Sequence, residues 1–375
     1  MRRIPFTTRK YGQGLSLIEL LIGMGLSLLA IVAIYQVLNV WESRKRTVTS
    51  GSGAQISGSI GITEIERDMQ LSGMGFGNAS SATIGCSVAA HNSTLTTHDF
   101  SFTFSPVVIT DGASGAPDVV RILYGNSAYV VNIQKVNSST SSSKTLQFRT
   151  GFNAGDLVVV SGNSPRDCNM FEVTGNDPGD IETIDHGTAS YTNFYTNAAT
   201  IPTMNVAGTT TAYPNGAEIY NLGPGAQLTE WKVTSGVLTR MNVLRDNTAI
   251  EVTDGVVNLQ AQYGIDGANG GTVNGRIEDA EWTNTAPTDW TKLLAVRFAV
   301  LARSGQYEKD VVTPSGLANP DDGPSWAGGS FKMLNLDGSS GASAPAAIAN
   351  DWKHYRYRVY ETVVPLRNML WGATS

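Results

Sequence analysis

Histidine and the motifs of common catalytic sites are scarce in this 375-residue sequence. Its four histidines, His91, His98, His186 and His354, are scattered without the spacing of a metal site, and no His-Glu-x-x-His segment occurs. A Gly-x-x-x-x-Gly-Lys phosphate loop and a Gly-x-Ser-x-Gly nucleophile turn are absent as well. We therefore expect neither an enzyme nor a protein that holds a metal or another cofactor.

Charge is also scarce. Charged residues make up 15% of the sequence, and the formal net charge at pH 7 is −6. This balance disfavours a broad basic surface for nucleic acid, so we expect no nucleic-acid partner. Abundant Gly, Ser, Thr and Asn accompany the few charges, which is typical of a β-rich domain outside the cytosol.

Cysteine occurs only twice, as Cys86 and Cys168. In an oxidising compartment, such as a periplasm, an isolated pair predicts one disulfide. Closing a loop of about 80 residues would contribute about 4 kcal/mol to stability in the chain-entropy model.

The N-terminal part of the chain contains a long apolar run that follows a short basic leader. From Leu15 to Val40 the only side chain that is charged at neutral pH is that of Glu19. As a helix this run would be about 39 Å long, enough to cross a hydrocarbon core of about 30 Å. We therefore expect a membrane-spanning helix over residues 15–40.

Glu19 is the unusual residue of this run, because a carboxylate in a membrane helix costs about 2.5–3.5 kcal/mol. Gly14 precedes the apolar run, whereas a secretory signal places its small residues after it. Cleavage after Gly14 would give Leu15 a free amino group four residues from Glu19. These opposite charges could neutralise each other within one helix or between neighbouring helices.

This arrangement resembles the class III signal of type IV prepilins. In that family a prepilin peptidase cuts after the glycine and methylates the new N-terminus, and the glutamate at the fifth mature position pairs with the amine of a neighbouring subunit. The resemblance implies cleavage after Gly14, N-methylation of Leu15 and an assembly role for Glu19. Removing the four basic residues of the leader would leave 22 basic and 32 acidic residues, a net charge of about −10.

Helix signals continue beyond the span, although glycine interrupts them. Four glycines lie between residues 47 and 61, and each weakens a helix by roughly 1 kcal/mol relative to Ala. We therefore expect a hinged segment there. Ile62, Ile65 and Met69 then recur at helical spacing and predict a stripe that covers a sheet, before a glycine-rich segment from Gly73 ends the helix.

From about residue 100 the pattern changes to period two, as in Phe100, Phe102 and Phe104. Two polar segments, 176–215 and 314–350, are expected to be long loops. Further strands are expected at Val119–Tyr124, Tyr129–Val136, Leu146–Arg149, Leu157–Ser161, Met170–Thr174, Glu218–Leu222, Leu228–Val233, Val237–Met241, Val256–Ile265, Leu293–Arg303 and Tyr355–Pro365.

The predicted fold class is α+β, with a long N-terminal helix packed on a large antiparallel β-rich domain, as in pilins. The expected regions are a leader over 1–14, a transmembrane helix over 15–40, a helix extension with a Gly-rich hinge over 41–75, and a periplasmic β-rich domain over 76–375.

Several segments resemble minor pilins of the PilW type. Singly each is a weak strand pattern, but in this order they are fairly specific. They are Glu66-Arg67-Asp68-Met69, the run from Ala154 to Val160, Gly236-Val237-Leu238-Thr239-Arg240, Val256-Val257-Asn258-Leu259, Gln262-Tyr263-Gly264-Ile265-Asp266, Ala295-Val296-Arg297, Ala302-Arg303-Ser304 and Val363-Val364-Pro365-Leu366-Arg367-Asn368.

The resemblance implies a subunit that primes type IV pilus assembly near the fibre tip, in a complex with other minor pilins. The implied partners are a prepilin peptidase, the other minor pilins, the major pilin and the bacterial inner membrane, with a tip adhesin as a further candidate. The domain would be periplasmic before assembly and in the surface pilus afterwards. Two alternatives stay open: a J-type pseudopilin of type II secretion, and a membrane-anchored periplasmic binding module that is not cleaved after Gly14.

Two further patterns have a structural and a functional interpretation. His354, Arg356, Arg358 and Tyr360 alternate along one strand and could form a small basic face for DNA, although Arg and Tyr also line ordinary sheets. The segment Asp266–Gly271 stands where some relatives carry an Asp-rich calcium loop. Its alternate residues offer no side-chain oxygen, so we expect a Gly-rich hairpin.

Overall fold

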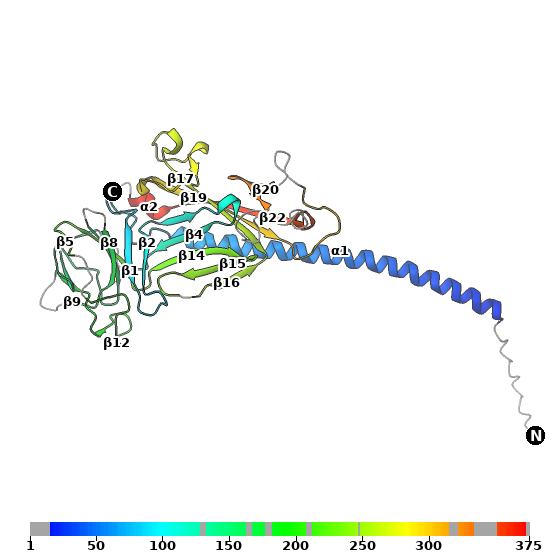
Figure 1. Ribbon diagram of the computed structural model, residues 1–375, viewed down its shortest axis with the longest axis horizontal. Coiled ribbons are helices and arrows are strands. Elements are labelled where there is room, and N and C mark those ends of the chain that lie inside the picture. Colours follow the sequence, from blue (N-terminus) through cyan, green and yellow to red (C-terminus); the bar gives the residue numbers. More distant parts are fainter. Residues whose placement is uncertain are drawn as a thin grey trace, which may run out of the picture. The chain divides into compact units, whose positions relative to one another are not determined.

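The computed structural model describes residues 16–127, 133–162, 167–176, 182–207, 212–246, 248–314, 322–333 and 351–372. The chain divides into two units, residues 1–52 and 53–375. Helix α1, Leu17–Leu71, belongs to both, and the strands belong to the second (Figure 1). The predicted class, a long N-terminal helix with an antiparallel β-rich domain, is confirmed.

Three larger sheets form the second unit among the described residues. The first has the strand order β2-β1-β8-β7-β13-β5-β6-β10-β9, the second β16-β15-β14-β4-β3 and the third β18-β17-β19-β22. The strands of the first sheet are β1 Ser87–His91, β2 Asp99–Thr103, β5 Gln134–Ser139, β6 Ser143–Leu146, β7 Leu157–Ser161, β8 Asp167–Glu172, β9 Gly175–Asn176, β10 Thr183–Asp185 and β13 Glu218–Gly223.

Apart from β3 and β4, the strands of the other two sheets come from the C-terminal half of the chain. Their strands are β3 Val107–Thr110, β4 Val119–Tyr124, β14 Gln227–Thr234, β15 Val237–Asn242, β16 Ile250–Asp254, β17 Val256–Ile265, β18 Trp282–Thr283, β19 Leu293–Arg303 and β22 Tyr357–Pro365. A short helix, α2 Arg367–Gly372, follows β22.

Both segments expected to be long loops contain short strands in their described parts. Segment 176–215 contains β10 and, further on, the hairpin of β11 Tyr191–Thr192 and β12 Ala199–Thr200. Segment 314–350 contains the hairpin of β20 Asp322–Trp326 and β21 Gly329–Lys332, while residues 334–350 lie outside the described residues. Such strands are too short for a periodic signal in the sequence.

Most strand pairs are antiparallel, but β1 and β8 pair in parallel, with Val88 opposite Cys168. The predicted disulfide joins Cys86, just before β1, to Cys168 in β8, with Cα atoms 6.1 Å apart. Both sulfurs are buried beside the main core. The bond therefore fastens two strands that are 82 residues apart in the sequence.

A second, smaller core lies under β5, β6 and β10, and it contains a buried cation. The Lys144 ammonium donates to Thr140 O at 2.7 Å and contacts the His186 Nε2 at 2.8 Å. Because the ammonium must donate to this nitrogen, the imidazole is held neutral. Burial and the Lys144 charge lower the pKa of His186 to about 3.

This pair predicts a loss of stability in mild acid. Unfolded His186 takes up a proton near pH 6.5, whereas the folded imidazole does so only near pH 3. The free energy of unfolding should therefore fall as pH decreases between these values, by up to about 1.4 kcal/mol per pH unit. Denaturant unfolding of His186→Gln between pH 7 and pH 4 should show a shallower slope than the parent chain. Equal slopes would contradict this assignment.

Candidate assembly site

The described part of the chain begins with the cap of α1, which includes Glu19. The Ser16 backbone N–H donates to Glu19 Oε2 at 3.0 Å, and Ser16 Oγ accepts from the Ile18 N–H at 3.3 Å. This is close to a capping box, and the carboxylate also sits favourably at the positive end of the helix dipole. Glu19 is thus held at the helix start by its own chain. Gly14 and Leu15 lie outside the described residues.

The segment Leu17–Glu42 of α1 is apolar on every side, with a mean hydropathy of 2.5 and no residue buried within the protein. Leu17 and Leu29 are about as exposed as side chains on a free helix, at 76% and 69%. Exposure of such an apolar surface to water is unfavourable, whereas its exposure to the hydrocarbon core of a lipid bilayer is favourable. Length and composition therefore indicate that this segment anchors the chain in a membrane.

In the second unit, one face of α1 packs on the sheets. Its buried positions recur at spacings of three and four, as expected for a helix with one covered side. The first are small and the later ones large: Ala54, Ser57, Gly58, Gly61, Ile65, Asp68 and Met69. Figure 1 shows this part of α1 running alongside β14 and β15.

The two glycines of this face allow the helix to approach the sheets closely. A Cβ at Gly58 would lie 2.2 Å from the Tyr360 ring, and one at Gly61 would lie 3.1 Å from Leu238 Cδ2. The Tyr360 hydroxyl donates to Gln55 O at 3.0 Å, which ties β22 to the same turn of α1. The helix is continuous through the segment where a hinge was expected, and these glycines serve packing there. A hinge stays a prediction.

Two matched substitutions separate packing from helix propensity. Gly53 has open space around its Cβ position, so Gly53→Ala should raise the free energy of unfolding by about 0.5–1 kcal/mol. Gly58→Ala should instead lower it by about 1–3 kcal/mol, because Tyr360 must move and lose its bond to Gln55. Denaturant titration of both variants provides the comparison. If both changes were stabilising, the close packing at Gly58 would be disproved.

A buried carboxylate fastens the next turn of α1 to the five-stranded sheet. Asp68 accepts from Trp231 Nε1 at 3.0 Å and from the Tyr124 hydroxyl at 3.2 Å. Arg240 Nε lies 3.4 Å from the same carboxylate. Burial raises the pKa of Asp68, and the Arg240 charge and the two hydrogen bonds oppose that rise.

The end of α1 is held by the C-terminal segment. The Asn368 side-chain amide donates to Ser72 O at 2.9 Å and to Leu71 O at 3.3 Å, which are carbonyls that the helix leaves free. Gly73 donates its N–H to Leu123 O at 3.0 Å with φ at +78°, so the predicted glycine stop is confirmed. Arg240, Tyr360 and Asn368 all come from the C-terminal half of the chain and all bind α1.

The prediction that His354, Arg356, Arg358 and Tyr360 alternate along one strand is wrong, because His354 ends a 3-10 helix, Asp351–His354, and Arg356 precedes β22. Arg356 forms a two-bond ion pair with Glu308, at 2.5 and 2.9 Å. His354 Nδ1 lies 2.8 Å from Glu308 O, and the Tyr360 hydroxyl is used by α1. Both arginines are exposed, but Arg356 is paired with Glu308, so Arg358 is the cation that β22 itself presents to solvent.

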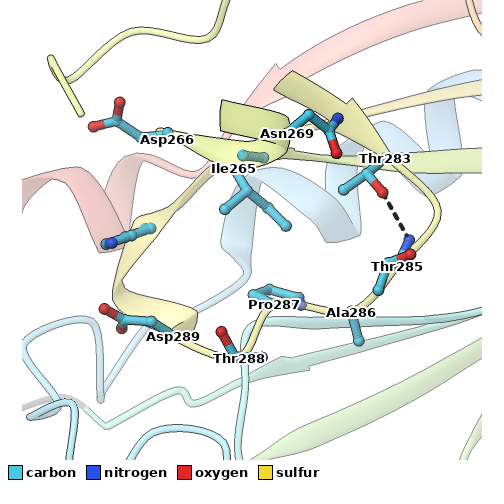
Figure 2. Close-up of a pocket in the computed structure, with 12 residues that line it drawn as sticks. Ile265, Asp266, Asn269, Thr283, Thr285, Ala286, Pro287, Thr288 and Asp289 are labelled. Carbon is cyan, nitrogen blue, oxygen red and sulfur yellow. Dashed lines mark hydrogen bonds between the residues drawn. The ribbon is translucent and has the colours of Figure 1, made fainter. Parts of the chain in front are cut away.

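Both oxygens of Asp266 are occupied by its own loop. They accept from the N–H groups of Asn274 and Gly275, at 2.9 and 2.8 Å. The loop borders an open cavity of about 320 Å³ between the 266–269 turn and the 285–289 segment, where Ile265 points toward Pro287 (Figure 2). The described residues contain no cluster of three or more His, Cys, Asp or Glu side chains suited to a metal.

One region of the chain, which includes residues that bind α1, matches a known protein family. Residues 235–368 match the family model PilW, described as Type IV Pilus-assembly protein W. No curated protein and no solved structure matches the chain. The matched range contains Arg240 and Tyr360 and ends at Asn368, so it includes these three side chains that bind α1. Residues 235–368 of the chain are thus similar to a family that is described as acting in type IV pilus assembly.

Proposed function

We propose that this chain is a minor pilin that primes assembly of a type IV pilus, near the fibre tip and in a complex with other minor pilins. One observation carries the proposal. The PilW-matching region binds the helix whose other end is an apolar anchor capped by Glu19. An apolar anchor and a β-rich domain are thereby joined through one helix, as a fibre subunit requires.

In this proposal the chain is made with residues 1–14 as a leader, and prepilin peptidase cuts after Gly14 and methylates Leu15. The helix then spans the inner membrane, and the β-rich domain from about residue 76 lies in the periplasm until the pilus carries it to the cell surface. Retention of Glu19 favours a position just below the tip cap. Neighbouring subunits would be other minor pilins and the major pilin.

The cap at the helix start suggests how Glu19 would act. Before assembly its carboxylate accepts the Ser16 N–H, which neutralises part of the cost of carrying it into lipid. In the fibre it would exchange this bond for the amine at Leu15 of a neighbouring subunit. The new pair is stronger because both groups are charged and water is excluded.

The N-terminal residue and mass of the membrane-extracted protein test the proposal. A start at N-methyl-Leu15 is expected, and an intact Met1 in a host with active prepilin peptidase would favour the anchored binding module instead. Glu19→Ala should reduce incorporation into pili by about tenfold or more, since even 1.4 kcal/mol corresponds to a factor of ten.

Ser16→Ala is the matched control. It removes the hydroxyl of the cap but keeps the Glu19 carboxylate, so incorporation should stay close to that of the parent chain.

A strain that lacks this chain tests the alternative function. If it fails to secrete an enzyme but still makes pili, the chain is a secretion pseudopilin.

A further inference from the structure

The hairpin of β11 and β12 lies in the longest uncharged part of the domain. From His186 to Ala217 the sequence contains no Asp, Glu, Lys or Arg, whereas the chain average of 15% would place about five there. Two large apolar side chains nevertheless point outward: Phe194 is 56% exposed and Ile201 is 71% exposed. An uncharged surface with exposed apolar groups has the composition of an interface core.

A buried carboxylate clamps both legs of this hairpin. Glu172, at the end of β8, accepts from the Tyr191 hydroxyl through Oε1 and from the Thr203 N–H at 3.0 Å through Oε2. Its own N–H donates to Asn205 Oδ1 at 2.8 Å. The base of the hairpin is therefore fixed to the nine-stranded sheet on both sides.

A second buried carboxylate fixes the turn. Asp156 accepts from the Tyr195 hydroxyl at 2.6 Å, and the Phe194 N–H donates to Ala154 O at 3.0 Å. Inside the turn, Asn193 Oδ1 accepts from the N–H groups of Tyr195 and Thr196. These bonds hold the Phe194 backbone while its ring remains exposed.

Alternation places the exposed apolar residue of the second leg on the outer face. Tyr191 is buried and its register partner is Thr200, whereas Thr192 and its partner Ala199 are both exposed. Because side chains two residues apart share a face, Ile201 lies on the same side as Ala199. The hairpin thus turns Tyr191 toward the protein and places Ala199 and Ile201 on its uncharged outer face.

From this arrangement we infer that the 191–203 hairpin is a docking element, and that its partner is a neighbouring pilus subunit with an uncharged, apolar pocket for Phe194 and Ile201. The inference rests on the proposed function. Pre-ordering by two buried carboxylates lowers the entropy cost of binding, and an exposed aromatic ring on a fixed turn has the character of a hot spot. A branched aliphatic side chain such as Ile201 offers no flat face to a sugar, which favours a protein partner over a glycan.

The test uses the full chain, co-expressed with the other minor pilins of its host and isolated in detergent. Phe194→Asp and Ile201→Asp should each reduce the recovered partner subunits by about tenfold or more, because a carboxylate would be buried in an apolar pocket. Val273→Asp, at a residue 60% exposed in the loop between β17 and β18, is the matched control and should leave recovery unchanged. Raising NaCl from 0.1 to 0.5 M should alter recovery little, since no charge lies in the contact.

A second variant tests how much the fixed position of the turn contributes, apart from the Phe194 side chain itself. Tyr195→Phe keeps the ring but removes the hydroxyl bonded to Asp156, so recovery should fall less than with Phe194→Asp. Recovery equal to the parent for both aspartate variants, with an unchanged thermal midpoint, would overturn the docking assignment. Binding of cellohexaose through Phe194, with subunit recovery unaffected, would also overturn it.

The proposed function fails through a different result. If the parent chain recovers no pilus subunit and its deletion leaves pili unchanged, the minor-pilin assignment is wrong. If the parent chain recovers its partners while Phe194→Asp does so equally well, only the docking assignment is wrong.

Discussion

Asp68→Ala is expected to lower the free energy of unfolding by about 3 kcal/mol. The substitution leaves two buried donors, Trp231 Nε1 and the Tyr124 hydroxyl, without their acceptor. An unsatisfied buried donor costs about 1–3 kcal/mol, so two of them give most of the effect. Arg240 adds less, because its side chain is 40% exposed and water can replace the lost partner.

Glu66→Ala is the matched control for this prediction. Glu66 lies on the same helix and its carboxylate accepts a 3.2 Å bond from the exposed Gln70 amide. Its removal should change stability by less than about 0.5 kcal/mol. Denaturant titration followed by tryptophan fluorescence compares the two, with Trp231 as a local reporter. An Asp68→Ala variant as stable as Glu66→Ala would show that the buried cluster is not needed to hold α1.

The same variant bears on assembly. If α1 transmits position from the membrane to the β-rich domain, loosening it at Asp68 should reduce incorporation into pili even though Glu19 is intact. A domain that tolerates Asp68→Ala in the fibre would instead indicate that neighbouring subunits hold the helix in place.

Long apolar strands were readable from the sequence because several buried residues in a row leave little choice of structure. Val119–Tyr124, Leu157–Ser161, Val256–Ile265 and Leu293–Arg303 agree with β4, β7, β17 and β19 at both ends. The predicted strand Leu146–Arg149 is wrong in position: β6 ends at Leu146, because β10 pairs with residues 143–145. Such a register depends on a partner about forty residues away, which local composition does not reveal.

The helix-binding residues were less accessible to sequence reasoning. Glycine propensity suggested a hinge, yet Gly58 and Gly61 follow Ala54 at spacings of four and three, which is a signal for a closely packed face. The partners of these helix residues could not be predicted, because Arg240 and Asn368 lie far along the chain from Asp68 and Ser72. The cap between Ser16 and Glu19, by contrast, follows the Ser-x-x-Glu pattern and could have been predicted.

Removal of the disulfide through Cys86→Ala with Cys168→Ala is expected to cost about 4 kcal/mol, the largest single effect in the domain. The bond closes a loop of 82 residues, and the entropy that it removes from the unfolded chain grows with loop length. Few backbone pairs stabilise the contact between β1 and β8 in the folded state. Only three residue pairs join β1 to β8, and their parallel geometry is slightly less stable per residue than an antiparallel ladder.

The loss should be visible beyond these two strands. β1 carries the edge strand β2 and starts just after the loop in which Ser80 and Thr83 donate to Glu218 on β13, at 2.7 and 2.6 Å. Loosening of β1 should therefore increase hydrogen exchange at β2 and in the 78–86 loop before it does so in β17 or β19. A reductant provides the control: it should bring the parent chain to the stability of the double variant and leave the double variant unchanged. If the reduced parent chain stayed about 4 kcal/mol more stable than the variant, the loss would come from the alanines in the core rather than from the missing bond, and the entropic account would be wrong.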